Sequence, residues 1–401
     1  MLNVLLLAAC AGCQASDAEL VSSNLTATAT PSIPAIVHSN WPLFRGDGTS
    51  SGVSTGELPE TLSLQWTFDV ENGAFESTAA IVDGVVYIGD LDGRFVALRL
   101  SDGKRLWTYQ LEQQLGFVSS PAVRDGLIFI GDIDGGFHCL DAAKGKPKWM
   151  FPSEAEINSS ANFYKGNVLV GSQDATLYCL KAETGELVWK HQIEDQVRCS
   201  PTVAEDKTFL VGCDAKLHII DLADGTAVHA VRLDSPSGTT PAVRGDFAYF
   251  GTHGGKFYCV NWRLGEVTWT FQDPDDPQSF QASAAVNESL VVIGCRNRRV
   301  YGLDPANGEL QWTFVAKRSV DSSPVIVGGR VFVGSSDGRL YGLDAATGEE
   351  VWSYEAGGGI VASPAIADGR LVIANDDGRV FCFGTDSGLG SAPAPDSTPS
   401  R

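Results

Sequence analysis

Residues 319–354 read SVDSSPVIVGGRVFVGSSDGRLYGLDAATGEEVWSY. This stretch contains four short runs rich in β-branched and aromatic residues, separated by the turn sequences GG, SDG and AATG. Gly-Gly and Asp-Gly pairs supply the positive φ angles that tight hairpin turns require. The stretch therefore predicts four antiparallel strands joined by three tight turns.

The same pattern recurs along the chain at a period of about 40 residues, which indicates a repeat architecture. Eight first strands are recognisable, among them ESTAAIV, VSSPAVR, RCSPTVA and ASPAIA. The eighth unit lacks a fourth strand, but residues 62–68 (LSLQWTF) supply one upstream of the first unit. We therefore expect an all-β fold: an eight-bladed propeller of four-stranded antiparallel blades, closed by the N-terminal strand, because an open array would leave both ends unpaired.

A tryptophan at a fixed place in the fourth strands is expected to bury its ring against the next blade. These blade-docking residues are Trp66, Trp107, Trp149, Trp189, Trp269, Trp312 and Trp352. His229 takes this place in the fourth unit, which predicts the weakest joint there. Third strands carry a small residue, often Cys, which we interpret as a spacer.

The chain ends differ in composition from the repeats. Residues 1–13 end an apolar run in Leu-Ala-Ala-Cys, which resembles the lipobox of bacterial lipoproteins, with Cys10 as the lipidated residue and Cys13 as a weaker alternative. An apolar start without export is the other interpretation. Residues 14–40 have the composition of a disordered tether and residues 385–401 of a disordered tail, which leaves 41–384 for the propeller.

Composition limits the function. Lys plus Arg number 29 and Asp plus Glu number 49, so the net charge of −20 opposes nucleic-acid binding. Acidic pairs such as Asp90 with Asp92 and Asp132 with Asp134 resemble calcium ligands, but turn formation explains them. The six His residues show no zinc-ligand spacing, and we predict no metal site.

Cys199 and Cys213 lie in the first two strands of the fourth unit. If the hairpin folds about Asp206, the two residues are opposite one another, within reach of a disulfide. The sequence therefore leaves two alternatives, a cross-strand disulfide or two buried thiols.

Loops that join a fourth strand to the next first strand should line one face of the ring. Several are acidic, at 152–158, 191–197 and 272–280. The charged residues that we predict to face a partner protein are acidic Asp273, Asp275 and Asp276, and basic Arg296, Arg298, Arg299, Lys317 and Arg318. Charge of both signs on one rim can steer a partner protein, with ordinary solvated loop charge as the alternative.

The A-x-T-G-E-x-x-W turns, the SSP first strands, the GSxDGxLYGLD strand pairs and the opening WPLFRG together resemble the quinoprotein-like, or PQQ-like, β-propeller repeat family. That family includes enzymes and non-enzymes, so the fold does not decide the function. Its enzymatic branch, the dehydrogenases, implies PQQ and Ca²⁺ in the central funnel. Here the chain has no Cys-Cys dipeptide and no c-type haem motif, and no catalytic or cofactor-binding residue can be assigned.

The non-catalytic branch is represented by the propeller lipoprotein of the outer-membrane barrel-assembly machinery. This chain resembles it in length, in a cysteine near the start that suits lipidation, and in short loops between the blades. The resemblance implies a protein-binding scaffold, exported and lipid-anchored at the periplasmic face of the outer membrane or at the cell surface, that uses no cofactor. A PQQ- and Ca²⁺-dependent dehydrogenase and a small-ligand or glycan sensor are the alternatives.

Overall fold

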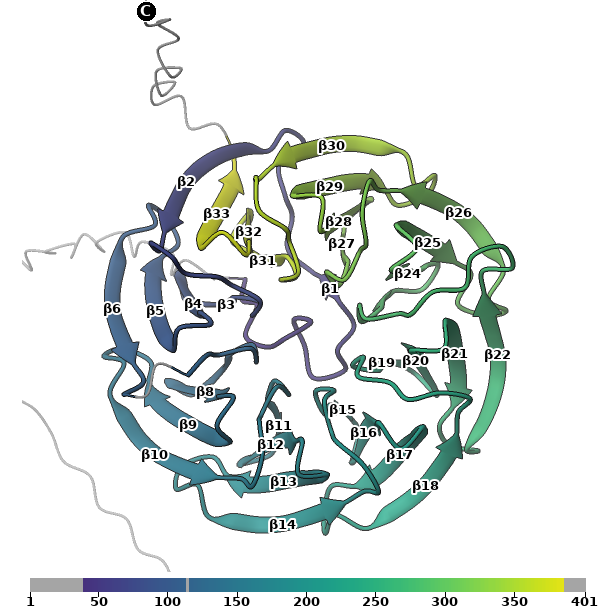
Figure 1. Cartoon of the computed structure of the whole chain (residues 1–401), viewed down its shortest axis with the longest axis horizontal. Helices are drawn as coiled ribbons and strands as arrows, with labels where there is room; N and C mark the ends of the chain where they lie inside the picture. Colours follow the sequence, from purple (N-terminus) through teal and green to yellow (C-terminus); the bar gives the residue numbers. More distant parts are fainter. Residues whose placement is uncertain (1–38, 113–114, 386–401) are drawn as a thin grey trace, which may run out of the picture. The chain divides into compact units, whose positions relative to one another are not determined.

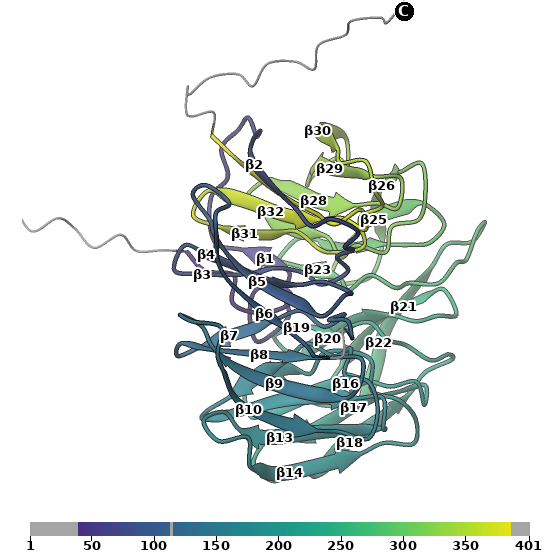
Figure 2. The same ribbon diagram turned by 60° about the vertical axis from the view of Figure 1, so that its left-hand side comes forward.

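The computed structural model describes residues 39–112 and 115–385. Within these residues every regular element is a β-strand, and the strands form eight sheets arranged in a ring (Figures 1 and 2). The all-β, eight-bladed propeller that the repeats predict is confirmed.

The strands of blades one to four follow in chain order, from the centre of the ring outward. Blade one has β3 (Ala80–Val82), β4 (Val85–Gly89), β5 (Arg94–Arg99) and β6 (Arg105–Gln110). Blade two has β7 (Ala122–Arg124), β8 (Leu127–Gly131), β9 (Gly136–Asp141) and β10 (Pro147–Pro152). Blade three has β11 (Asn162–Tyr164), β12 (Asn167–Ser172), β13 (Thr176–Lys181) and β14 (Leu187–Gln192). Blade four has β15 (Thr202–Ala204), β16 (Lys207–Val211), β17 (Lys216–Asp221) and β18 (Ala227–Arg232).

Blades five to eight continue in the same way, and the eighth takes its outer strand from the start of the chain. Blade five has β19 (Ala242–Arg244), β20 (Phe247–Gly251), β21 (Lys256–Asn261) and β22 (Glu266–Gln272). Blade six has β23 (Ala285–Val286), β24 (Val291–Gly294), β25 (Arg299–Leu303) and β26 (Leu310–Val315). Blade seven has β27 (Val325–Val327), β28 (Arg330–Gly334), β29 (Arg339–Asp344) and β30 (Glu350–Glu355). Blade eight has β31 (Ala365–Ala367), β32 (Arg370–Ala374), β33 (Arg379–Gly384) and β2 (Ser63–Asp69).

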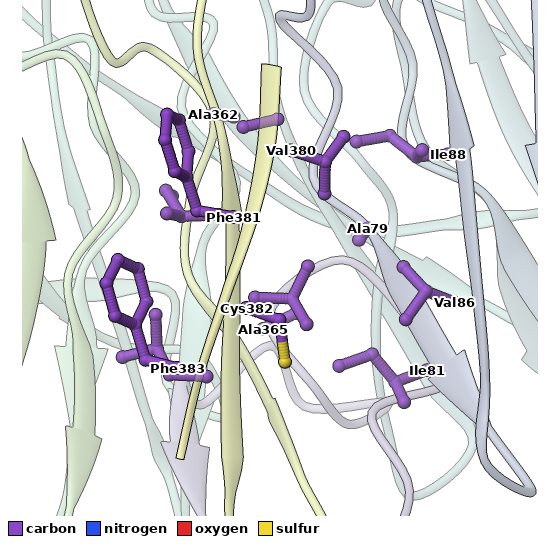
Figure 3. Packing of buried hydrophobic residues seen from close by; sticks show 14 of the residues in the cluster. Ala79, Ile81, Val86, Ile88, Ala362, Ala365, Val380, Phe381, Cys382 and Phe383 are labelled. Atoms are coloured by element: carbon purple, nitrogen blue, oxygen red, sulfur yellow. The ribbon is translucent and has the colours of Figure 1, made fainter. Parts of the chain in front are cut away.

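The predicted closure is present. Strand β2 pairs antiparallel with β33, from Ser63 opposite Gly384 to Asp69 opposite Arg379. Both faces of β33 are buried, because Phe381 and Phe383 point to one side and Val380 and Cys382 to the other, toward blade one (Figure 3). The last blade is therefore completed by the first strand of the ring and packs against the first blade.

The fourth-strand tryptophans form the joints between blades. Each indole NH donates to a backbone carbonyl: Trp66 to Leu100, Trp107 to Ala142, Trp149 to Ala182, Trp189 to Leu222, Trp269 to Pro305, Trp312 to Ala345 and Trp352 to Leu62, at 2.8–3.3 Å. Except for Trp352, the ring lies against a glycine of the next blade's last turn, as for Trp149, where a Cβ on Gly185 would come within 2.7 Å of the indole. Gly185 has φ +75°, so both space and backbone require glycine there.

The third-strand spacers make room for these indoles. Cys139 pairs with Trp149, Cys259 with Trp269 and Gly302 with Trp312. In blade four the combination is reversed, because the smaller His229 pairs with the larger Ile219. The pair thus keeps a similar total volume with a different shape.

The joint between blades four and five has a second replacement. Trp262 of blade five is 4% exposed, and its ring meets Phe209 of blade four edge to face at 5.3 Å. Its indole NH donates to Gly245 at 2.9 Å. An aromatic side chain from the next blade therefore fills the joint at which the usual tryptophan is missing.

This arrangement predicts that Trp262→Ala is more damaging than His229→Ala. Removing a buried tryptophan should cost about 3–5 kcal/mol, whereas the half-buried His229 should cost about 1 kcal/mol. Urea unfolding of both variants, followed by tryptophan fluorescence and circular dichroism, measures the difference. Equal losses would show that Trp262 does not replace the missing indole.

Candidate functional site

The segment 41–54 fills part of the central channel, where Figure 1 shows it running across the middle of the ring. Amides of the innermost strands donate to its carbonyls in chain order: Ile81 to Trp41, Val123 to Pro42, Val203 to Gly48, Val243 to Thr49, Val286 to Ser51 and Ile326 to Gly52, at 2.7–2.9 Å. The short strand β1 (Val53–Ser54) then pairs in parallel with β27. We call residues 41–54 the plug.

Arg45 fixes the plug in the channel. Its side chain is 1% exposed, and its guanidinium donates to the carbonyls of Ser323, Ala284 and Pro324. Burial lowers the pKa of Arg45 to about 9, partly offset by the charge of Asp47, so the group stays protonated at neutral pH. A buried cation that binds carbonyls of two blades holds the N-terminal segment to the ring.

A closed ring of eight side-chain hydroxyls surrounds the channel beside the plug. Each hydroxyl oxygen accepts the backbone NH of its counterpart in the preceding blade, at 2.9–3.1 Å. The members are Thr78, Ser120, Ser160, Ser200, Thr240, Ser283, Ser323 and Ser363, none more than 8% exposed. These residues belong to the SSP segments that the sequence places in the first strands. The strands begin two residues later, because here the backbone bonds to the next blade instead of to its own sheet.

The hydroxyl ring lines a cavity of about 160 Å³. Phe44 of the plug, Glu76, Arg198 and Asp321 also line it. Asp321 is held by Arg296, whose Nε lies 3.0 Å from its carboxylate. Binding sites for cofactors and drug-sized ligands usually measure about 300–1,000 Å³, so this cavity suits water or a very small polar ligand.

The channel residues do not fit the PQQ and Ca²⁺ of the family's enzymatic branch. The one aromatic side chain in the cavity lining, Phe44, belongs to the plug. The two lining carboxylates do not converge with a third ligand, and across residues 39–112 and 115–385 no three His, Cys, Asp or Glu side chains are grouped to hold a metal ion.

The acidic pairs act as turn residues. Asp90 Oδ1 accepts the amides of Asp92 and Arg94, at 3.0 and 2.8 Å. Asp132 Oδ1 does the same for Asp134 and Gly136, at 2.9 and 2.7 Å. The interpretation as turn formation is confirmed.

Three of the predicted partner-facing charges, Asp273, Asp276 and Arg299, pair with one another. Asp273 is 9% exposed; Tyr301 and Arg299 donate to its Oδ2 at 2.6 and 3.2 Å, and the amides of Asp275 and Asp276 to its Oδ1 at 2.9 and 3.0 Å. Although burial favours protonation, the bond from Tyr301 and the backbone amides hold the pKa of Asp273 below its usual value. Asp273 is thus a buried residue whose carboxylate stabilises its loop.

The basic members of the set lie at the turn between β24 and β25 of blade six and in the loop that follows β26. Arg296 binds Asp321, and Arg299 also lies 3.8 Å from Asp276. Arg298 adopts φ +69° in its turn, and the Lys317 amide donates to Asp337. Arg318 lies beside Lys317 in the loop after β26, where its carbonyl accepts the Ser335 hydroxyl at 3.4 Å. The acidic loop 272–280 and the basic turn of blade six are therefore joined through Arg299. That this rim faces a partner protein stays a prediction.

Cys199 and Cys213 are free thiols in the structure, and the expected register is off by one residue. The turn has two residues, since Ala204 pairs with Lys207 and Thr202 with Phe209; continued, this register places Cys199 opposite Gly212. Cys199 Sγ accepts the Val211 amide at 3.4 Å, as Ser119 Oγ accepts that of Gly131. Burial raises the pKa of Cys199 to about 12. Two thiols, one buried and one half-buried, are the alternative that the structure supports.

Cys10, Cys13, most of the predicted tether and the predicted tail lie outside the described residues. At the tether's end, Ser39 and Asp368 exchange two hydrogen bonds of 2.7 Å, so Ser39, which the sequence assigned to the tether, is joined to blade eight. In the described part, no helix is long and apolar enough to cross a membrane.

The fold and the plugged channel define an eight-bladed propeller built from PQQ-like repeats. A family model described as outer membrane protein assembly factor BamB matches residues 59–163, 138–294 and 296–389. The chain belongs to this PQQ-like, BamB-type propeller family. No curated protein gives a significant sequence match.

Solved structures from both branches share the fold. BamB from Moraxella catarrhalis has a TM-score of 0.68 at 18% identity, over 82% of this chain and 98% of that one. Quinohemoprotein alcohol dehydrogenase from Comamonas testosteroni has a TM-score of 0.75 at 17% identity, over 90% and 82%. The computationally designed Ika8 protein has 0.72 at 16% identity, over 80% and 99%. At these identities the likeness establishes the fold alone.

The hydroxyl ring predicts a specific tolerance. Ser200→Ala removes the acceptor of the Ser160 amide and should destabilise the protein by about 1–3 kcal/mol. Ser200→Thr should be nearly neutral, because Thr78 and Thr240 hold the same place in other blades. Urea unfolding and amide exchange at Ser160 test this, and unchanged exchange in Ser200→Ala would contradict it.

Proposed function

We propose that this protein is a non-catalytic, lipid-anchored scaffold that binds proteins during outer-membrane protein assembly. The observation that carries the proposal is the plug, which together with the hydroxyl ring reduces the funnel to a cavity of about 160 Å³. Family membership and the likeness to BamB of Moraxella catarrhalis support the same role.

The surface left for a partner is the outside of the propeller. On one face of the ring, loops join each outer strand to the next inner strand, and we call this face the loop face. It carries exposed acidic side chains. Glu154 and Glu156 lie in loop 152–158, and Glu194 and Asp195 in loop 191–197. Exposed charges of this kind govern association rate and specificity more than affinity. A partner that meets these loops should present basic side chains.

The scaffold proposal predicts that reversing charges on the loop face weakens binding of the partner protein. Tagged full-length protein, cross-linked in the cell envelope and captured, should recover a component of the barrel-assembly machinery. The double variant Glu156→Lys with Asp195→Lys should reduce recovery at least threefold. Glu183→Lys, an exposed residue in the turn before the outer strand on the opposite face, is the matched control.

Two results would reject the scaffold. One is capture of no barrel-assembly component together with normal outer-membrane protein levels in a deletion strain. The other is stoichiometric uptake of PQQ with Ca²⁺ and dye reduction by an alcohol or a sugar, which would support the dehydrogenase branch.

The anchor is a separate prediction. Cys10→Ser should move the protein from the membrane fraction to the soluble fraction, because it removes the thiol that would carry the lipid. Cys13→Ser should leave it in the membrane fraction. Fractionation with mass analysis of the N-terminus tests both, and an unmodified Cys10 in the mature protein would contradict the anchor.

A further inference from the structure

A second cavity lies at the rim, between blades one and two, away from the channel. It has a volume of about 500 Å³, within the range of small-ligand sites. Tyr109 and Leu111 of blade one, Leu115 of the connecting loop and Met150 of blade two form apolar walls. Met150 is 56% exposed. We call this cavity the rim pocket.

At the rim pocket, blade two lacks a basic residue that most blades have. In six blades, the first residue of the third strand is basic and forms an ion pair: Arg94 with Asp90, Lys216 with Glu194, Lys256 with Asp234, Arg299 with Asp273, Arg339 with Glu355 and Arg379 with Asp69. The other two blades have no basic residue there: blade three has Thr176, and blade two has Gly136, which lines the pocket.

Blade two keeps an acidic residue at the position whose carboxylate pairs with lysine in blades four and five. Glu194 lies five residues after Trp189 and contacts the Lys216 ammonium at 2.6 Å. Glu112 lies five residues after Trp107, in the corresponding loop, and lines the rim pocket. Across the described ranges, Glu112 takes part in no ion pair, and no Lys or Arg lines the pocket. A carboxylate without its cation therefore stands beside an apolar cavity.

At the base of the pocket, the hydrogen-bonded pair of Asp132 and His138 lies where a side chain at position 136 would otherwise stand. His138 Nε2 lies 2.6 Å from Asp132 Oδ2, and a Cβ on residue 136 would come within 2.6 Å of that oxygen and 2.7 Å of that nitrogen. A side chain at 136 would thus displace the Asp132–His138 pair. Burial and the charges of Asp132 and Glu112 raise the pKa of Tyr109, which agrees with a negative potential in the pocket.

We propose that the rim pocket binds an organic cation with an apolar body. The ammonium or guanidinium group pairs with Glu112, and the apolar part packs on Tyr109 and Met150. In blades four and five, an internal lysine ammonium makes the equivalent pair. The same chemistry is offered by a small hydrophobic amine and by a basic side chain next to an aromatic residue in a polypeptide. This inference is independent of the scaffold function.

The chain provides its own probe for this site. It has two methionines, Met1 and Met150, so selective ¹³C-methyl labelling of methionine gives one internal signal, inside the pocket. The full chain is titrated with 2-phenylethylammonium, 3-phenylpropionate and 2-phenylethanol. We expect a saturable shift of the Met150 methyl signal with the ammonium alone.

Two variants test the charge. Glu112→Gln should weaken ammonium binding about two- to fivefold, the size of one exposed ion pair, and high salt should do the same. Glu154→Gln, at the corresponding place in the next loop and outside the pocket, should leave it unchanged. Tighter binding of the blocked dipeptide acetyl-Phe-Lys-amide than of the amine would indicate a polypeptide ligand, and weaker binding a small amine. An equal response to all three small probes, no shift, or unchanged binding by Glu112→Gln would overturn the proposal.

Discussion

The contact on which this propeller depends is the one between an indole and a glycine turn. Six of the seven outer-strand tryptophans lie against the last turn of the next blade and donate to its backbone, as Trp149 does to Ala182 beside Gly185. This contact holds neighbouring blades together at the periphery. At the centre, the hydroxyl ring joins the same blades through hydrogen bonds of 2.9–3.1 Å. Because every blade needs a neighbour on both sides, the ring is complete only when β2 pairs with β33 and presents Trp66 to blade one.

The plug determines where function can lie. A propeller funnel usually offers the deepest concave site of the fold, yet here residues 41–54 bond to six of the inner strands and Arg45 binds three buried carbonyls. Removing the plug would expose these groups without partners, at a cost of about 1–3 kcal/mol each. The plug is therefore part of the folded state, and binding is left to the loop face and the rim.

The sequence predicted the fold well because its signals are local and repeated: the turn glycines, the alternating strands and the tryptophan period. It did not predict the plug, although WPLFRG was recognised as a motif, since the partners of Arg45 lie more than 200 residues away. The hydroxyl ring was hidden for the same reason, because the SSP segments resemble strand starts. The predicted pairing of Cys199 was wrong by one residue because the turn of this hairpin has two residues. The burial of Asp273 was not predicted because its partners, Tyr301 and Arg299, come from the following blade.

A repeated fold also gives a reference against which single departures can be interpreted. Blade four has His229 in place of the tryptophan. The residue paired with it, Ile219, is larger than the small residues found there in other blades, and Trp262 of blade five fills the joint, so two side chains restore the packing. Blade two loses a basic residue at Gly136, and nothing replaces it: the acidic Glu112 remains, the Asp132–His138 pair occupies the backbone side, and a cavity of about 500 Å³ stays open. A departure that is repaired preserves stability alone. In blade two, an unpaired carboxylate beside an empty apolar cavity costs free energy, and a bound ligand can recover that cost. For that reason the rim pocket is a stronger candidate for a ligand site than the joint of blade four.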